Sequence, residues 1–92
     1  MTDWNNKKEV LKAVREDLYV LWKASEEMRA DKEVVLQAVE RDGSALQYAS
    51  EELRNDKEVV LAAVKQEFYA HRYASKELKN DPEFMKEVDQ YL

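Results

Sequence analysis

Apolar residues recur along this chain at the three- and four-residue spacing of an α-helix, and the whole pattern returns every 25 positions. In residues 31–55, DKEVVLQAVERDGSALQYASEELRN, this spacing places Val35, Ala38 and Val39 on one face. Residues 56–80, DKEVVLAAVKQEFYAHRYASKELKN, are identical to them at 15 of 25 positions. Internal repetition at such a period is typical of stacked supersecondary units.

Two further segments continue the repeat. Residues 6–30, NKKEVLKAVREDLYVLWKASEEMRA, form a more divergent copy, and residues 81–92, DPEFMKEVDQYL, match the front half of a fourth. The pattern predicts an all-α fold of stacked helical hairpins, a small α-solenoid of about seven short helices. We expect a single domain over residues 1–92, made of the repeats 6–30, 31–55 and 56–80 and the half repeat 81–92.

Cap residues indicate where the helices begin. Asp31, Asp56 and Asp81 stand where an N-cap oxygen is needed, and Pro82 suits the first helical position. Gly43 is expected to end the first helix of its repeat in left-handed geometry. The Ser-x-x-Gln pattern that follows predicts a capping box at the start of the second helix.

Large side chains replace the Gly43-Ser44 pair in the outer repeats, as Leu18-Tyr19 and Phe68-Tyr69. A bulky residue in left-handed geometry costs about 1 kcal/mol, and loss of a serine cap about 1 kcal/mol more. Trp, Tyr and Arg, which occur on the same helix faces, are enriched at binding hot spots, and local rules broken without a gain in folding tend to mark function. The predicted partner-binding residues are Leu18, Tyr19, Trp22, Lys23, Gln47, Phe68, Tyr69, His71 and Arg72.

Packing is the alternative explanation for these side chains. Leu18 and Phe68 would then fill a gap under the turn, or the helix end would shift by one residue and need no positive φ. Tyr48 and Tyr73 agree between repeats and are expected to pack. Lys23 holds the equivalent position in the first repeat, where it would open a notch beside the preceding tryptophan.

Single residues elsewhere have structural interpretations. His71 is the only histidine and there is no cysteine, so it is expected to be a rim contact or a core histidine rather than a metal ligand. Trp4 is expected to cover one open end of the array, and Phe84 and Val88 the other, because terminal units need closing.

The repeat 31–55 resembles a family of bacterial and protist helical repeats known as domain of unknown function 4116. The family pattern is similar to DKEVVLxAVxxxGxALxYASxELRxD, which residues 31–55 match almost throughout. The resemblance covers nearly the whole chain and implies a helical repeat, with no reaction, cofactor or catalytic residue to carry over. Two near-consensus copies with substitutions on one face also suggest an engineered variant of such a scaffold.

Composition narrows the class of protein. A net charge of −5 works against nucleic acid, whose binding rests on Lys and Arg. No apolar run approaches the ~18 residues that a membrane-spanning helix needs. Without cysteine there is no disulfide or thiolate site. No segment has the pattern of a secretion signal, so we expect a cytoplasmic location if the chain is natural.

These observations predict a non-enzymatic protein–protein interaction module with a protein partner and no cofactor, monomeric when unbound. The alternative is a structural segment of a longer natural repeat array, or a homodimer, with the aromatic side chains in packing. An enzyme would need a nucleophile with a base, a metal cluster or a phosphate loop, and the sequence has one histidine, one glycine and no cysteine.

Overall fold

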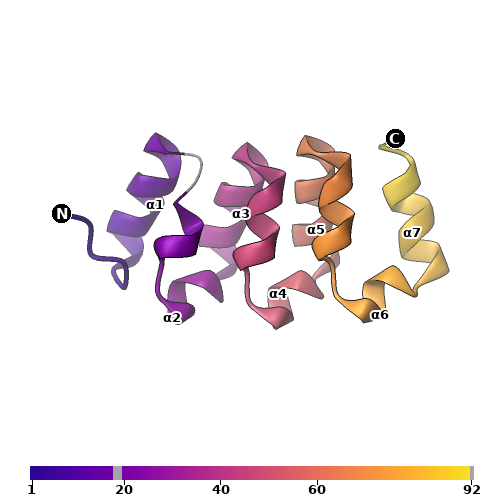
Figure 1. Ribbon diagram of the computed structural model, residues 1–92, viewed down its shortest axis with the longest axis horizontal. Coiled ribbons are helices and arrows are strands. Elements are labelled where there is room, and N and C mark those ends of the chain that lie inside the picture. Colours follow the sequence, from indigo (N-terminus) through magenta and orange to yellow (C-terminus); the bar gives the residue numbers. More distant parts are fainter. Residues whose placement is uncertain (18–19, 92) are drawn as a thin grey trace.

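The computed structural model describes residues 1–17 and 20–91, and all regular elements within those residues are helical. The units stand side by side in an array whose first and last described residues lie at opposite ends (Figure 1). The all-α helical repeat predicted from the sequence is confirmed. The elements are α1 (Lys7–Glu16), η1 (Leu21–Lys23), α2 (Glu26–Arg29), α3 (Lys32–Arg41), η2 (Gly43–Tyr48), α4 (Glu51–Arg54), α5 (Lys57–Gln66), η3 (Phe68–Tyr73), α6 (Lys76–Lys79) and α7 (Pro82–Asp89), where η denotes a 3₁₀ helix.

The second arm of each predicted hairpin is divided into a 3₁₀ helix and a four-residue α-helix. In η2, the Ala49 N–H donates to the Leu46 carbonyl at 3.1 Å, an i to i+3 bond of the 3₁₀ type. Ala49 is itself extended. Ser50 is the N-cap of α4, and its hydroxyl accepts a hydrogen bond from the Leu53 N–H at 3.2 Å. The same Ala-Ser pair separates η1 from α2 and η3 from α6.

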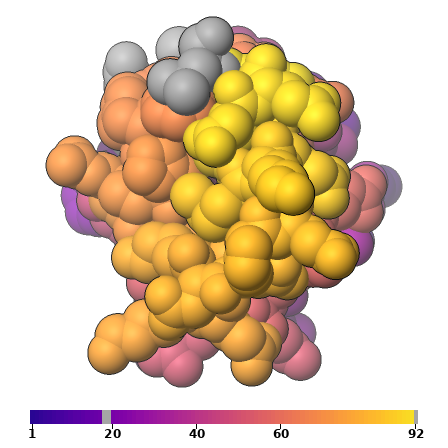
Figure 2. Space-filling view, turned by 90° about the vertical axis from the view of Figure 1, so that its right-hand side faces the viewer, coloured from indigo at the N-terminus to yellow at the C-terminus, as the bar shows by residue number. Residues whose placement is uncertain are grey.

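The array measures 43 × 21 × 15 Å and has two layers. α1, α3, α5 and α7 contact one another in order along one layer, and η1, η2 and η3 contact one another along the other. At the C-terminal end, α7 stands alongside α5 (Figure 1), and α6 lies beneath α7 (Figure 2). Phe84 and Val88 of α7 are buried, and Trp4 packs half-buried against the core at the other end, as predicted.

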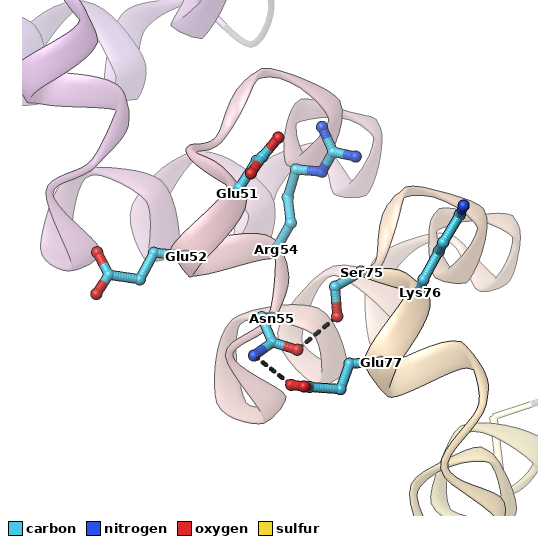
Figure 3. A pocket seen from close by; sticks show the side chains of 7 residues that line it. All are labelled: Glu51, Glu52, Arg54, Asn55, Ser75, Lys76 and Glu77. Carbon is cyan, nitrogen blue, oxygen red and sulfur yellow. Dashed lines mark hydrogen bonds between the residues drawn. The ribbon is translucent and has the colours of Figure 1, made fainter.

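Polar contacts join each repeat to the next beside the short helices. Asn55 accepts a hydrogen bond from the Ser75 hydroxyl and donates from Nδ2 to Glu77 Oε2 at 2.9 Å (Figure 3). Backbone bonds of 2.9–3.0 Å run from the N–H of each capping serine to a carbonyl of the preceding unit: Ser25 to Trp4, Ser50 to Arg29 and Ser75 to Arg54.

Lysine side chains form a second connection between repeats. The Lys32 ammonium lies 2.9 Å from the Asp56 carboxylate and 2.8 Å from Glu58. Lys7 makes the equivalent contacts one repeat earlier, and Lys57 lies 3.8 Å from the next N-cap aspartate. Hydrogen bonds to Glu58 and Asp56 raise the pKa of Lys32. Partial burial acts to raise the pKa of Asp56, but the bonds from Lys32 and from backbone N–H groups lower it overall.

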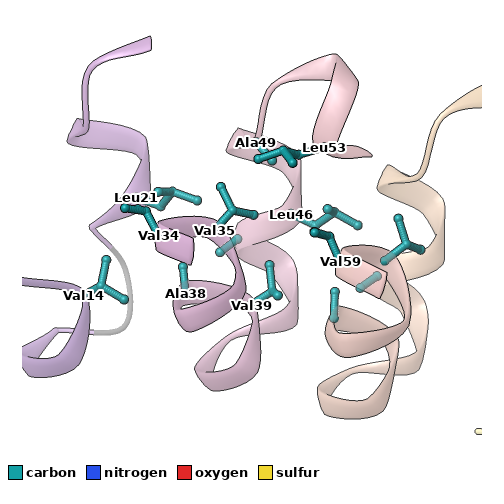
Figure 4. Packing of buried hydrophobic residues seen from close by; sticks show 14 of the residues in the cluster. Val14, Leu21, Val34, Val35, Ala38, Val39, Leu46, Ala49, Leu53 and Val59 are labelled. Atoms are coloured by element: carbon teal, nitrogen blue, oxygen red, sulfur yellow. The ribbon is translucent and has the colours of Figure 1, made fainter. Parts of the chain in front are cut away.

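The core is a continuous cluster of aliphatic side chains between the two layers (Figure 4). Val35 and Val39 of α3 and Leu46 of η2 are fully buried, and Ala49 and Leu53 are nearly so. The helical spacing placed Val35, Ala38 and Val39 on one face, and the structure buries that face. Burying a Val or Leu side chain contributes about 1.5–3 kcal/mol, so this cluster is the main source of stability.

Gly43 does not have the conformation predicted from the sequence. Among the described residues no φ is positive, α3 ends at Arg41, and Gly43 begins η2 after an extended Asp42. A Cβ at Gly43 would lie 2.4 Å from the carbonyl oxygen of Ala63 in α5. The glycine is therefore required by the close approach of the neighbouring repeat rather than by left-handed geometry.

The predicted capping box is also wrong. Ser44 does not cap a helix; its N–H and hydroxyl both donate to Asp42 Oδ1, at 3.0 and 2.6 Å. Gln47 donates from Nε2 to the Ser44 carbonyl at 3.1 Å. Because neither positive φ nor a serine cap exists here, Phe68 stands at its position without the backbone penalty predicted for it. Leu18, for which the same penalty was predicted, lies outside the described residues.

Candidate functional site

The layer formed by η1, η2 and η3 carries most of the predicted binding residues. Equivalent positions of adjacent repeats bring Trp22, Gln47 and Arg72 into one row across this layer, and all three are exposed. The next row begins with exposed Lys23 and Tyr48. We use the name η face for the exposed side chains of these 3₁₀ helices: Trp22, Lys23, Gln47, Tyr48, Tyr69 and Arg72.

Aromatic exposure is high on the η face. Trp22 is 56% exposed, Tyr69 46% and Tyr48 37%. Tyr73 packs against the core as predicted, whereas Tyr48, for which packing was also predicted, remains partly open to solvent. Scattered single apolar residues are normal on protein surfaces, and it is the presence of all three rings on the 3₁₀ helices of one layer that makes them candidates.

Trp22 and Lys23 form one end of the η face. The Lys23 ammonium lies 5.5 Å from the centroid of the Trp22 ring and 5.9 Å from that of Trp4. Both distances are within the range of cation–π attraction, which contributes about 0.5–1 kcal/mol at exposed sites. The lysine ammonium is therefore attracted to both rings.

A hollow of about 140 Å³ lies between η1 and η2 beside Trp22. The sequence predicted a notch next to this tryptophan, but Lys23 does not line it. Its apolar walls come from Leu21, Trp22, Ala45 and Tyr48, and its polar walls from Asp42, Ser44 and Gln47. A cavity of about 150 Å³ is large enough for a benzene ring, so this hollow has room for one aliphatic or small aromatic side chain.

The start of η3 differs from the start of η2. Glu67 takes the place of Asp42 and makes no side-chain bond to the backbone of η3. Its carboxylate instead accepts a hydrogen bond from the Tyr69 hydroxyl, just as Asp42 accepts one from Ser44. The hydrogen bond to Glu67, together with partial desolvation, raises the pKa of Tyr69. The Glu-x-Tyr pair thus preserves a hydroxyl–carboxylate contact, which the sequence analysis did not recognise.

Phe68 and His71 lie at the edge of the η face. Both are half-buried, and their rings pack edge to face with centroids 5.0 Å apart. His71 therefore lies neither in the core nor fully in solvent, as expected for a rim position. Leu18 and Tyr19, the remaining predicted binding residues, lie outside the described residues.

A larger hollow lies elsewhere in the described part of the chain. It measures about 500 Å³ and lies along the seam of Figure 3, between α4 and α6. Its side chains include Asn55, Ser75 and Glu77, which already bond to one another. A similar hollow lies at the preceding seam, beside Arg29 and Ser50. The stacking of repeats is enough to explain both.

Two classes of site have no representative among residues 1–17 and 20–91. No three His, Cys, Asp or Glu side chains there gather in a way that would hold a metal ion. In the same residues, no helix combines the length and the apolar character needed to cross a membrane.

Comparison with known proteins identifies one family. A family model described as Domain of unknown function (DUF4116) matches residues 6–54 and 31–70, which together span more than half of the chain. Neither the curated proteins nor the solved structures include a match. The matched segments contain η1 and η2 and end at Ala70 within η3, and the chain belongs to the DUF4116 family.

Proposed function

We propose that this chain is a non-enzymatic protein-binding module that contacts its partner through the η face. The observation that carries the proposal is the exposure of Trp22, Tyr48 and Tyr69 on one layer of the array. We further propose that the unbound protein is a monomer and, for a natural chain, that it acts in the cytoplasm. That the chain is an engineered variant stays a prediction, and the proposal holds for either origin.

The residue types support a protein partner. Trp, Tyr and Arg are the side chains that dominate binding energy at protein interfaces, and they do so when they are surrounded by contacts that exclude water. Trp22 and Arg72 lie in one row of the η face with Gln47 between them, next to a hollow that has room for an apolar side chain. Repeat proteins commonly bind through such rows, since each unit presents the same position.

A simple estimate shows that the tryptophan alone is energetically significant. An aromatic side chain buries about 150–250 Å² in full, and somewhat more than half of Trp22 is exposed. Covering that part at about 25 cal/mol per Å² contributes about 2–3 kcal/mol before any ordering cost. Phe68 occupies its position at ordinary φ, so no backbone strain there has to be explained by binding.

The proposal is tested with Trp22→Ala. Proteins captured on the immobilised wild-type chain are identified, and the affinity of the purified partner for wild type and variant is measured by isothermal titration calorimetry. We expect the variant to keep its helical circular dichroism and to bind about 30-fold more weakly, which corresponds to about 2 kcal/mol. Tyr91→Ala is the matched control, because Tyr91 is 38% exposed and lies beyond α7, where its ring contacts Lys65.

Two outcomes would contradict the proposal. Equal affinity of Trp22→Ala and wild type would remove the η face from the interface. Sedimentation equilibrium showing a tight dimer that Trp22→Ala dissociates would favour the alternative, in which these rings pack against a second copy.

A further inference from the structure

The charge of the η face differs from that of the protein as a whole. The chain has 20 Asp and Glu against 15 Lys and Arg. Yet η1, η2 and η3 contain no acidic residue, and they contain Lys23, His71 and Arg72. Lys79 adds a further cation beside η3, since its ammonium donates to the Arg72 carbonyl at 3.2 Å. The 3₁₀ helices of an acidic protein therefore carry only cations as charged side chains, on η1 and η3, whereas Glu26 and Glu51 of the neighbouring α2 and α4 line a hollow with Tyr48 of η2.

The carboxylates that directly precede η2 and η3 are already engaged. Asp42 is buried and accepts two hydrogen bonds from Ser44. Glu67 accepts the hydrogen bond of Tyr69. Neither is an ion-pair partner of Arg72 in the described part of the chain, so the guanidinium remains available to an external carboxylate, which it binds with paired N–H donors.

The hollow beside Trp22 favours an apolar side chain rather than a carboxylate. Its walls are mainly Leu21, Trp22, Ala45 and Tyr48, and its polar wall includes the Asp42 carboxylate. A ligand carboxylate placed there would face Asp42 in a partly desolvated site, which is unfavourable. An apolar side chain fits, and the acidic group of a ligand is directed away from the hollow towards η3.

The spacing of the two subsites follows from the repeat. Neighbouring helices pack about 8–10 Å apart. The hollow lies between η1 and η2 and Arg72 lies on η3, which places the subsites about 12–15 Å apart. An extended chain advances about 3.3 Å per residue, so about four residues span that distance.

We infer that the η face binds an extended acidic polypeptide segment that has an apolar side chain in the hollow beside Trp22 and, about four residues away, a carboxylate on Arg72. This inference rests on the proposed function and specifies its partner. Attraction between the cationic face and an acidic segment also accelerates encounter and weakens with salt.

The test is selection from a display library of random 12-residue peptides on the wild-type chain. We expect enriched peptides to contain an apolar residue about four positions from Asp or Glu. When the library is selected on Arg72→Glu, the enriched peptides should have Lys or Arg in place of that acid. When it is selected on Arg72→Gln, the enriched peptides should show no charge preference. For a fluorescein-labelled wild-type winner, anisotropy should show at least tenfold weaker binding to Arg72→Glu, and weaker binding to wild type as NaCl rises from 50 to 300 mM.

Lys12→Glu is the matched control, because it makes the same change of charge at an exposed position of α1, outside the η face. It should leave the selected peptides and their affinity unchanged. Circular dichroism checks that each variant is folded.

The outcomes separate the inference from the proposed function. Peptides that depend on Trp22 but show no acidic preference, or whose charge preference does not change in Arg72→Glu, overturn the inference alone. If no peptide is enriched on wild type, or if the enriched peptides bind Trp22→Ala equally well, the proposed function fails as well.

Discussion

In the second repeat Gly43 begins η2 against the backbone of α5, whereas in the third repeat Phe68 begins η3 at the equivalent position. The residues before them have nearly the same conformation: φ −146 and ψ 101 for Asp42, φ −143 and ψ 109 for Glu67. The turn backbone is thus independent of the residue that follows it. What differs is the packing against the next unit and the side chain presented to solvent.

The second and third repeats therefore differ in how they pack on the next unit and in how the 3₁₀ helix is capped. The second repeat approaches its neighbour closely and caps its 3₁₀ helix with a buried aspartate. The third has a half-buried Phe68 and an exposed Tyr69, and makes no side-chain cap. Since a Cβ at position 68 excludes the approach that Gly43 makes, α7 packs on the third repeat differently from α5 on the second.

The largest expected effect comes from alanine at the two equivalent positions. Gly43→Ala places a Cβ 2.4 Å from a backbone oxygen. Overpacking of this kind destabilises the folded state by about 1–3 kcal/mol. The lower conformational entropy of the unfolded chain with alanine offsets only about 0.4–1 kcal/mol of this loss. Because the obstructing atom belongs to the backbone, we expect the upper end of this range, a net loss of about 2 kcal/mol by urea unfolding. Phe68→Ala should cost a similar amount for a different reason, since it removes a half-buried ring that packs against the core and against His71. A stabilising Gly43→Ala would show that the close approach does not exist.

The caps provide a second comparison. Asp42→Ala removes an acceptor that receives the N–H and the hydroxyl of Ser44, and should cost about 1–2 kcal/mol. Glu67→Ala should cost less than about 0.5 kcal/mol, because Glu67 does not cap η3 and the substitution removes only the hydrogen bond from the Tyr69 hydroxyl. Urea midpoints at pH 7 measure both. Equal losses would mean that the third repeat has a cap after all.

The lysine contacts at the repeat boundaries should give a smaller, pH-dependent effect. The folded pKa of Asp56 is lowered, so its contribution is present above its ordinary value of 3.8 and is lost as pH falls through the lower folded value. The raised pKa of Lys32 keeps that lysine charged beyond its ordinary 10.5, so its contribution is lost only above that pH. Lys32→Met should therefore lower the urea midpoint at pH 7 but not at pH 2.

Lys57→Met is the comparison for the next boundary. Its effect should be smaller, because Lys57 lies 3.8 Å from Asp81, whereas Lys32 contacts two carboxylates within 3 Å. A change of the same size at pH 2 in either variant would assign the effect to packing of the lysine methylenes instead.

The smallest expected effect concerns the Tyr69 hydroxyl. The hydrogen bond to Glu67 raises the pKa of Tyr69 above its ordinary value of 10.0. In a spectrophotometric titration at 295 nm, Glu67→Gln should lower that pKa, and Tyr69→Phe should remove one high-pH transition. Neither substitution should change the urea midpoint measurably. A titration of Tyr69 that is insensitive to residue 67 would show that the contact is not maintained in solution.

Several local features could be read from the sequence alone. The repeat is visible directly in the sequence. The aspartate N-caps and the buried side of each helix depend on residues within one or two helix turns, and both are present in the structure. The break at each Ala-Ser pair had a local signal too: Ser50 is followed by Glu51 and Glu52, the acids that suit a first helical turn. That signal was missed because the glycine was assigned as the only turn.

The candidate site was predictable only in part. Exposure of Trp22, Tyr69 and Arg72 follows from repeat position and helical spacing. The half-burial of Phe68 depends on its packing against the core and against His71, and the hollow beside Trp22 is made by residues from two repeats. Such features depend on how units lie against one another, which periodicity does not specify.

By itself the sequence determined that this protein is a stack of short helices and which residue types stand at equivalent places in it, because caps and apolar stripes act between near neighbours in the chain. Only the tertiary structure decided why Gly43 is a glycine and how the 3₁₀ helices share one face. A carbonyl of the next repeat approaches Gly43 too closely for any Cβ, and that constraint exists only after the repeats have stacked.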